Sequence, residues 1–403
     1  MTKFDPAALL VSRSQSSDEG PIIRMSQKSR ELRAKGVDVV ALTIGEPDFD
    51  TPANIRQAAA DAMNAGFTHY SPVAGIPELR TALSEKFRQE NGIDYSPAEI
   101  SVGNGAKQVV ANAILSIIDH GDEVIMLAPF WVSYEITVRF AGGTPVVLHA
   151  GVEENYKVPV ARIAAAVTPR TKLIIINSPS NPTGAVWTQK ELEDVAAIVR
   201  GHPKMMVLSD EIYEYIVFEG RMASIGALPD MKERTITVNG FSKGFAMTGW
   251  RLGFAGAPEP ITKSMTRMQG TISAGTNPFV QRAAIAALEG PRDEVERMRQ
   301  IYQARRDMVL KGLRAIPGVK IGGIPATFYA FPDVSELLGK KAGNHVLDTT
   351  DALCDWLLEE HAVATVPGGA FGAPGSIRLS FAASEADIEK ALNRLTAALA
   401  SLL

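Results

Sequence analysis

The chain has a single cysteine, Cys354, among 403 residues. One thiol cannot form an internal disulfide, nor can it supply the thiolates of a zinc or iron–sulfur site. A reducing compartment, the cytoplasm, therefore fits this sequence best. The six histidines show no HExxH or comparable metal-binding spacing, and no GxSxG motif is present for acyl transfer. We therefore expect no metal in the functional site.

Long apolar runs and an excess of one charge are also missing. No segment approaches the roughly 20 apolar residues needed to span a bilayer. The short run Ala7 to Val11 is followed by Ser12 and Arg13, which makes it too short for a secretory signal. With 41 Lys and Arg against 45 Asp and Glu, the net charge is −4. Neither a membrane nor nucleic acid is therefore an expected partner.

The composition is that of a globular protein, with 46% hydrophobic and 21% charged residues. A chain of 403 residues is longer than the usual domain with a single hydrophobic core, so we expect two domains. We predict an N-terminal segment, 1–45, that packs with a small domain. The large domain would span 46–290, and the small domain 291–403.

From about residue 50, predicted strands alternate with predicted helices. The uninterrupted apolar run Leu173 to Ile176 is typical of a strand buried on both faces. The alternation predicts an α/β fold, with a mostly parallel sheet flanked by helices, followed by a smaller α+β domain. In such sheets, ligands bind beyond the carboxyl ends of the strands. The other expected strands are 39–44, 100–102, 123–127, 205–208, 235–238, 328–331, 362–366 and 377–381, and the expected helices include 23–35, 108–118, 188–199 and 291–316.

Two predicted strand ends carry residues suited to ligand binding. The glycine turn 103–107 precedes a helix, where free N–H groups and the helix dipole favour a phosphate; an ordinary tight turn is the alternative. Asp210 closes a buried strand, where a carboxylate needs a cationic partner. The alternative for Asp210 is a helix N-cap or a solvated loop acid.

Two basic residues follow the strand at 235–238. Lys243 lies among small and apolar residues, and loss of solvent there favours the neutral, nucleophilic amine. The alternative is a surface lysine whose stem covers apolar area. Arg251, eight residues later, suits either a bidentate phosphate contact or a structural ion pair.

Arg378 lies in a strand whose alternation places Ile377, Leu379 and Phe381 on the opposite face. A guanidinium flanked by serines suits a carboxylate ligand. On pattern alone, a solvent-facing arginine on an edge strand is the stronger interpretation. Taken together, the phosphate turn, acid, lysine and arginine are the set that pyridoxal phosphate chemistry requires.

Five stretches that carry these residues resemble the class I pyridoxal-phosphate aminotransferases of fold type I, most closely the bacterial aspartate aminotransferases. They occur in family order, and the resemblance covers about residues 20–400. The stretches are IGEPDFDTP at 44–52, Tyr70 with GIPELR at 75–80, NSPSNPTG at 177–184, SDEIY at 209–213, and SK at 242–243 with TGWR at 248–251.

The resemblance implies a role for each catalytic residue. Lys243 would hold pyridoxal 5'-phosphate as a Schiff base and then shuttle the substrate's α-proton. Asp210 would pair with the protonated ring nitrogen, while Asn181 and Tyr213 would bond the phenolic oxygen. Trp131 would stack on the ring.

The resemblance also implies binding residues. Gly105, Ala106, Lys107 and Arg251 would surround the cofactor phosphate, with Tyr70 reaching in from a neighbouring subunit. A homodimer with shared active sites is therefore implied.

For the substrate, the resemblance implies that Arg378 binds the α-carboxylate and that Gly45, Trp131, Asn181 and Lys107 line the pocket. The expected reaction passes an amino group, from aspartate or glutamate, to a 2-oxo acid such as 2-oxoglutarate, by a ping-pong mechanism. The stretch 19–22 lacks the Ser or Thr pair that this branch often uses for a distal carboxylate.

Two other functions share the cofactor. The first is a C–S β-lyase on the same fold, in which a β-substituent is expelled. The second is a cofactor-binding regulator, which would carry an added basic winged-helix segment. The first 40 residues are too few and too neutral for such a segment.

Overall fold

The structure, a computed structural model, describes residues 5–11 and 20–402. Ser12, Arg13 and Glu19, which the sequence analysis used, lie outside this part. The helices are α2 (Pro21–Ala34), α3 (Ala53–Asn64), α4 (Pro77–Lys86), α5 (Ala106–Ile117), α6 (Ser133–Phe140), α7 (Val160–Ala166), α8 (Gln189–Arg200), α9 (Glu259–Ile272), α10 (Pro278–Glu289), α11 (Asp293–Arg314), α12 (Thr350–His361) and α13 (Glu385–Ala400). The strands are β1 (Val40–Ala41), β2 (Ile100–Gly103), β3 (Glu123–Ala128), β4 (Thr144–His149), β5 (Thr171–Asn177), β6 (Met206–Asp210), β7 (Thr235–Gly240), β8 (Gly253–Gly256), β9 (Tyr329–Ala330), β10 (Lys340–Ala342), β11 (His345–Leu347), β12 (Val363–Ala364), β13 (Val366–Pro367) and β14 (Ile377–Ser380).

The principal sheet has seven strands in the order β2-β8-β7-β6-β5-β3-β4. Strands β4, β3, β5, β6 and β7 run parallel, whereas β8 is antiparallel to both β2 and β7. The mostly parallel α/β sheet predicted from the alternation is therefore confirmed. Parallel register brings the carboxyl ends of β5, β6 and β7 to one edge, where the chain leaves the sheet at Asn177, Asp210 and Gly240.

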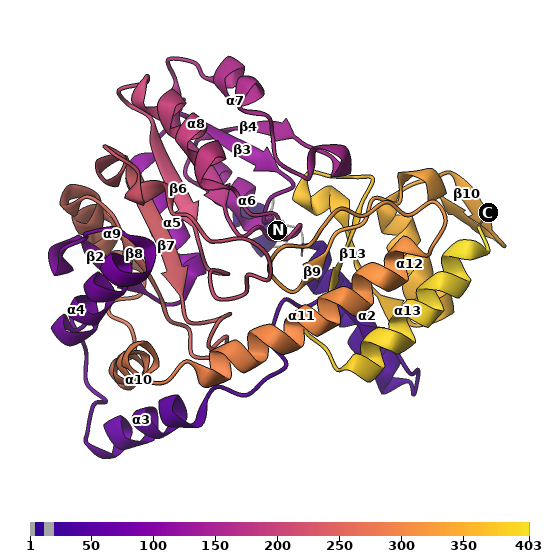
Figure 1. Cartoon of the computed structure of the whole chain (residues 1–403), viewed down its shortest axis with the longest axis horizontal. Coiled ribbons are helices and arrows are strands. Elements are labelled where there is room, and N and C mark those ends of the chain that lie inside the picture. The colour runs from indigo at the N-terminus through magenta and orange to yellow at the C-terminus, as the bar shows by residue number, and fades with distance from the viewer. Residues whose placement is uncertain (1–4, 12–19, 403) are drawn as a thin grey trace.

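Helices cover both faces of this sheet (Figure 1). Leu173 and Ile175 of β5 pack in the apolar cluster that contains α5, α6 and α9, and Ile174 and Ile176 pack with α7 and α8 on the other face. The strand is thus buried on both sides, as its apolar run predicted. Helix α8 begins where the expected helix 188–199 begins, at a capping box in which Glu191 N–H donates to Thr188 Oγ1 and the Glu191 carboxylate accepts from Thr188 N–H.

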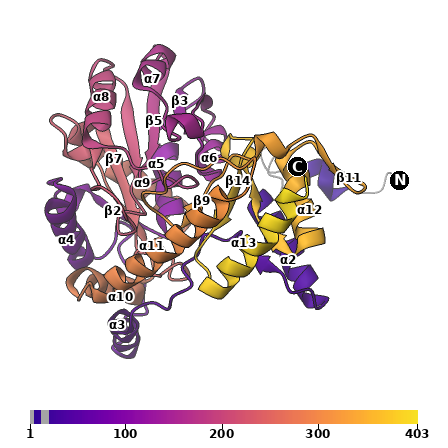
Figure 2. The ribbon, with the colours of Figure 1, turned by 45° about the vertical axis from the view of Figure 1, so that its right-hand side comes forward.

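The C-terminal part lies beside the sheet and holds α12, α13 and the antiparallel sheet β13-β14-β9 (Figure 2). The N-terminal segment packs here, because β1 pairs in parallel with β12 and Arg24 of α2 makes an ion pair with Asp355 at 2.9 Å. Helix α11 extends along both parts of the molecule (Figure 1). The domain boundaries at 45/46 and 290/291 stay a prediction.

Several local predictions were wrong. Of the expected strand 39–44, only Val40–Ala41 forms a ladder, because the chain then turns into the cavity described below. The expected strand 362–366 is two strands, β12 and β13, that belong to different sheets. Strands β4 and β8 were not predicted, and β8 reads Gly-Phe-Ala-Gly, a composition that is poor in strand-forming residues.

Within the described ranges, no helix is both long and apolar enough to cross a membrane. The same residues contain no group of three or more His, Cys, Asp or Glu side chains arranged to hold a metal ion.

Candidate active site

A cavity of about 240 Å³ lies at the carboxyl ends of the parallel strands. It brings together ten of the residues that the sequence analysis selected: Gly45, Ala106, Lys107, Trp131, Asn181, Asp210, Tyr213, Lys243, Arg251 and Arg378. Gly105 lies directly behind the wall, against Arg251. Tyr70 does not line this cavity, and its side chain is 99% exposed.

Lys243 follows β7 and directs its ammonium nitrogen to the carbonyl oxygen of Gly45, at 2.6 Å. Burial lowers the pKa of Lys243 to about 8, and the positive charges of Arg378 and Arg251 act in the same direction. Glu46 and Asp210 oppose this shift. The share of neutral, nucleophilic amine near neutral pH is therefore larger than that of a solvent-exposed lysine.

Asp210 ends β6 with its side chain almost fully buried. Burial raises the pKa of its carboxyl to about 6, although the hydroxyl of Tyr134 donates to Oδ2 at 2.6 Å and lowers it. A second donor, the N–H of Ile212, lies 3.3 Å from Oδ1. A cationic group bound in the cavity would favour the ionised carboxylate, because the opposite charge offsets the cost of burial.

The start of α5 forms an anion cradle. Its N-cap, Gly105, has φ +85°, and no side chain caps the helix. A Cβ at Gly105 would lie 2.6 Å from Nη2 of Arg251, so glycine allows the guanidinium to approach the helix end. Arg251 donates to the carbonyls of Thr248 and Asn104, at 2.9 and 3.4 Å. The helix dipole and the guanidinium together favour a phosphate here.

Arg378 is 2% exposed, so the solvent-facing interpretation of its strand pattern was wrong. Its guanidinium donates to Asn181 Oδ1 at 3.1 Å and to the Thr43 carbonyl at 2.6 Å. The rings of Tyr329 and Phe371 lie 4.6 and 4.9 Å from it. Its Nε has no hydrogen-bond partner, and no carboxylate of the described chain makes an ion pair with it. A buried cation without an anion is costly, so this group is suited to bind a carboxylate ligand.

Tyr213 and Tyr329 complete the wall beside Arg378. Their hydroxyl groups lie 3.0 Å apart, and burial raises the pKa of Tyr213 well above its ordinary value. A Cβ at Gly45 would lie 1.8 Å from the Tyr329 hydroxyl oxygen, so only glycine fits at this point of the wall. Asn181 is held at two points: its side-chain Oδ1 accepts from Arg378, and its backbone N–H donates to Asn177 Oδ1 at 2.8 Å.

Sequence reasoning missed seven residues that line the cavity: Ile22, Tyr134, Asn177, Ile212, Ser242, Thr248 and Tyr329. Two of them had a usable signal. Asn177 directly follows a predicted strand, and Tyr134 lies three residues after Trp131, in the first turn of α6. Ile22 had a signal only through the resemblance, which relates the stretch 19–22 to a distal carboxylate. Tyr329 had none, because its contact with the sheet is a tertiary feature.

The residues present fit pyridoxal phosphate. The uncapped helix end and Arg251 offer a phosphate cradle, the partly buried Lys243 offers an amine, and the buried carboxylate of Asp210 lacks a cationic partner of its own. The aromatic face of Trp131 lines the same cavity, with Lys107 Nζ 5.6 Å from its ring centre.

Comparison with known proteins agrees with this chemistry. The sequence model of the aminotransferase class I and II family matches residues 37–395, and the chain belongs to this family. Its members depend on pyridoxal 5'-phosphate, so this protein is a pyridoxal-phosphate-dependent aminotransferase.

Among its relatives, the chain is 43% identical to a probable aspartate/prephenate aminotransferase from Rhizobium leguminosarum, over 93% of this chain and 94% of that protein. Among solved structures, it is similar to the aspartate aminotransferase of Rhizobium meliloti, with a TM-score of 0.94, 38% identity and full coverage of both chains. It is also similar to that of Thermus thermophilus solved with maleate, with a TM-score of 0.91, 42% identity, and coverage of 98% and 99%. The fold-type-I architecture is thereby confirmed.

The lowered pKa of Lys243 predicts how the apoprotein takes up its cofactor. The rate at which pyridoxal 5'-phosphate is captured should rise with pH and level off above about 8, because only the neutral amine attacks the aldehyde. Stopped-flow absorbance from pH 6 to 10 measures this rate. An unshifted lysine would give a rate still rising near pH 10.

Replacing Asp210 with Asn should lower kcat roughly 100-fold or more, because a preorganised charge is lost from a water-poor site. The amide still accepts the hydrogen bond from Tyr134. Steady-state kinetics test the loss, and circular dichroism of the bound cofactor checks that binding persists. A variant with normal kcat would show that Asp210 does not control the ring nitrogen.

Proposed function

We propose that the protein moves the amino group of aspartate or glutamate to a 2-oxo acid such as 2-oxoglutarate. The observation that carries this proposal is the buried Arg378 guanidinium, which lacks a carboxylate partner and lines one cavity with Lys243 and Asp210. A substrate α-carboxylate supplies the missing anion.

Each proposed role follows from contacts within the chain. Bound pyridoxal phosphate supplies a protonated ring that draws electrons from the substrate's α-carbon. Asp210 keeps the ring nitrogen protonated, and Tyr134 orients its carboxylate. Lys243 Nζ takes the proton from the α-carbon, and the amine is available for this because its pKa is low. Asn181 and Tyr213 hold the phenolic oxygen.

The phosphate is held by Gly105, Ala106, Lys107 and Arg251 at the start of α5. Two residues support a substrate with a second acidic group. Lys107 provides a cation at the cavity wall, and Trp131 provides the surface below it. The relatives named above act on aspartate, and the Thermus protein was solved with maleate, a dicarboxylate.

The active site is proposed to be shared between two copies of the chain. The side chain of Tyr70 is 99% exposed in the single chain. The resemblance implies that this residue reaches the phosphate site of a neighbouring subunit, and a second copy of the chain would cover it. Other large apolar side chains are also exposed, among them Phe67 of the same loop and Ile136 and Phe140 of α6. A homodimer would cover such surface. Sedimentation velocity of the holoenzyme tests this, and a monomer would exclude it.

The amino donor is tested by half-transamination. Each amino acid is added to the purified holoenzyme, and conversion of the cofactor's visible absorbance to the pyridoxamine form is followed. Aspartate and glutamate should give the fastest conversion. Cystathionine, assayed for pyruvate release, tests β-lyase activity. Conversion by no amino acid, or pyruvate release as the faster reaction, would overturn the proposal.

Ile22 should limit the rate with dicarboxylic donors. It lines the cavity and packs on the apolar cluster of Phe331, Val366 and Phe371, where it cannot donate to a distal carboxylate. Ile22→Thr should raise kcat/KM for aspartate about 5-fold, the value of one hydrogen bond. Ile22→Val is the matched control, since it makes the same loss of volume without a hydroxyl. Equal gains in both variants would assign the effect to space alone.

A further inference from the structure

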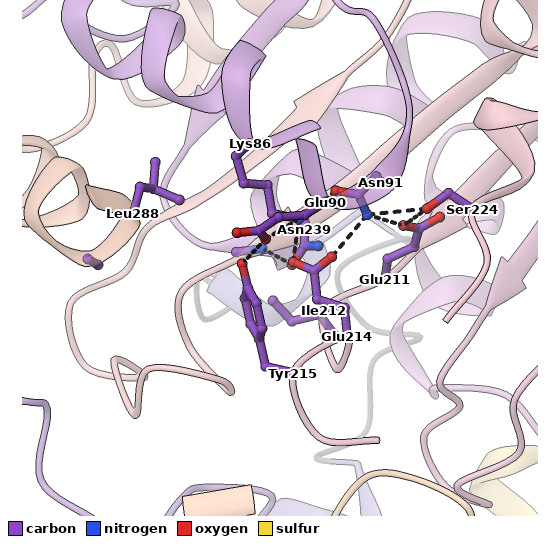
Figure 3. A network of polar contacts seen from close by, with 12 residues as sticks. Lys86, Glu90, Asn91, Glu211, Ile212, Glu214, Tyr215, Ser224, Asn239 and Leu288 are labelled. Carbon is purple, nitrogen blue, oxygen red and sulfur yellow. Dashed lines mark hydrogen bonds and ion pairs between the residues drawn. The ribbon is translucent and has the colours of Figure 1, made fainter. Parts of the chain in front are cut away.

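The turn that follows β6 has two sides. Asp210, Ile212 and Tyr213 line the cavity, whereas Glu211 and Glu214 face away from it into the protein. Figure 3 shows the buried polar cluster on that far side. We call Lys86, Asn91, Glu211, Glu214 and Ser224 the Glu211 network. None of its members lines the cavity.

Glu211 is fully buried, with 0% of its surface exposed. Its carboxylate accepts three hydrogen bonds, from Ser209 Oγ at 2.9 Å, Ser224 Oγ at 2.6 Å and Asn91 Nδ2 at 3.1 Å. Ser209 belongs to β6 itself, Ser224 to a loop later in the chain, and Asn91 to the turn that follows α4. The residue next to Asp210 is thus held from three directions.

Glu214 is tied to the same neighbours (Figure 3). Its side chain is 6% exposed and forms an ion pair with Lys86 at 2.5 Å, whose side chain is 3% exposed. Asn91 bridges the two glutamates, because its Nδ2 also lies 3.0 Å from Glu214 while its Oδ1 accepts from Lys86 at 2.6 Å. Residues Phe87–Asn91 form a π-helical turn that continues α4 and carries Asn91 to this position.

Stabilisation of the fold alone does not explain why these polar residues are buried together. It buries two carboxylates against one lysine, and the cost of removing such charges from water often exceeds the gain from pairing them. The network does provide rigidity, because all of its hydrogen bonds can form in only one arrangement of its side chains. The two glutamates lie on either side of Ile212 and Tyr213, so that arrangement also sets the cavity side of the turn.

We propose that the Glu211 network positions Asp210 and Tyr213 against the cofactor ring, with Glu211 and Glu214 acting as positioning residues for the reaction. The proposal rests on the pyridoxal-phosphate chemistry of the family and not on the identity of the amino donor. An experiment can therefore overturn this proposal without affecting the proposed amino donor, and the donor can be wrong without affecting this proposal.

The test uses the holoenzyme and a readout other than activity. Loss of the Glu211 carboxylate should let the turn relax and move Asp210 and Tyr213 relative to the ring. Glu211→Ala should therefore weaken binding of pyridoxal 5'-phosphate roughly 10-fold and shift the pH midpoint of the cofactor's visible absorbance. A displacement of about 1 Å would also lower kcat on the order of 100-fold.

Glu211→Gln should restore most of the wild-type midpoint. Its amide oxygen can accept from Ser224 and Asn91, and its amide nitrogen can donate to the Ser209 hydroxyl, which is free to rotate. Ser224→Ala is a milder second variant that removes one of the three donors. It decides the question if Glu211→Ala does not fold.

Glu123→Ala is the matched control. Glu123 is also a buried glutamate and accepts from Thr168 Oγ1 at 2.6 Å and Arg170 Nε at 2.8 Å, but it begins β3, at the end of the strand remote from the cavity. This variant should lower Tm and leave the cofactor midpoint unchanged. If Glu211→Ala and Ser224→Ala lower Tm while cofactor affinity and midpoint match wild type, the network is structural only and the proposal is wrong.

Discussion

The site depends on keeping three ionisable groups in one water-poor cavity without letting them neutralise one another. Lys243, Asp210 and Arg378 all line it, yet each makes its closest polar contact with a neutral group. The lysine donates to a carbonyl, the aspartate accepts from a tyrosine, and the arginine donates to a carbonyl and an amide. Each charge therefore stays free to interact with a ligand. Preorganised charges of this kind can stabilise the transition state of a reaction more than its substrate.

The parallel sheet makes this possible. Strands β5, β6 and β7 end together, so Asn177, Asp210 and the segment leading to Lys243 leave the sheet at one edge. Arg251 lies two residues before the antiparallel strand β8, which pairs with β2, and its guanidinium reaches the start of α5. Arg378 arrives from β14, in the C-terminal part of the molecule, and binds Asn181 across the junction. This hydrogen bond joins two parts of the chain that also share one buried apolar cluster, which includes Val102 of β2 and Leu379 of β14.

The turn after β6 is held on both sides. Tyr134 contacts Asp210 from the cavity side, and the Glu211 network contacts the turn from behind. Packed interiors are dense and buried polar groups need hydrogen-bond partners, so the position of a catalytic side chain depends on the residues that pack against it. In this turn, Asp210, Ile212 and Tyr213 line the cavity, whereas Glu211 and Glu214 contact buried partners.

Sequence alone predicted the α/β class, strands at 173–176 and 205–208 and the start of α8, because apolar periodicity is a property of neighbouring positions. Ten residues of the cavity followed from local motifs together with the resemblance to the family. Tertiary structure decided the burial of Arg378, the strand β8 that joins β2 to β7, and the arrival of Ile22 and Tyr329 at the cavity. It also placed Asn91 between Glu211 and Glu214, more than 100 residues away in the chain. No local pattern contains these contacts, since they depend on how distant elements pack and on which polar groups lose water when they do.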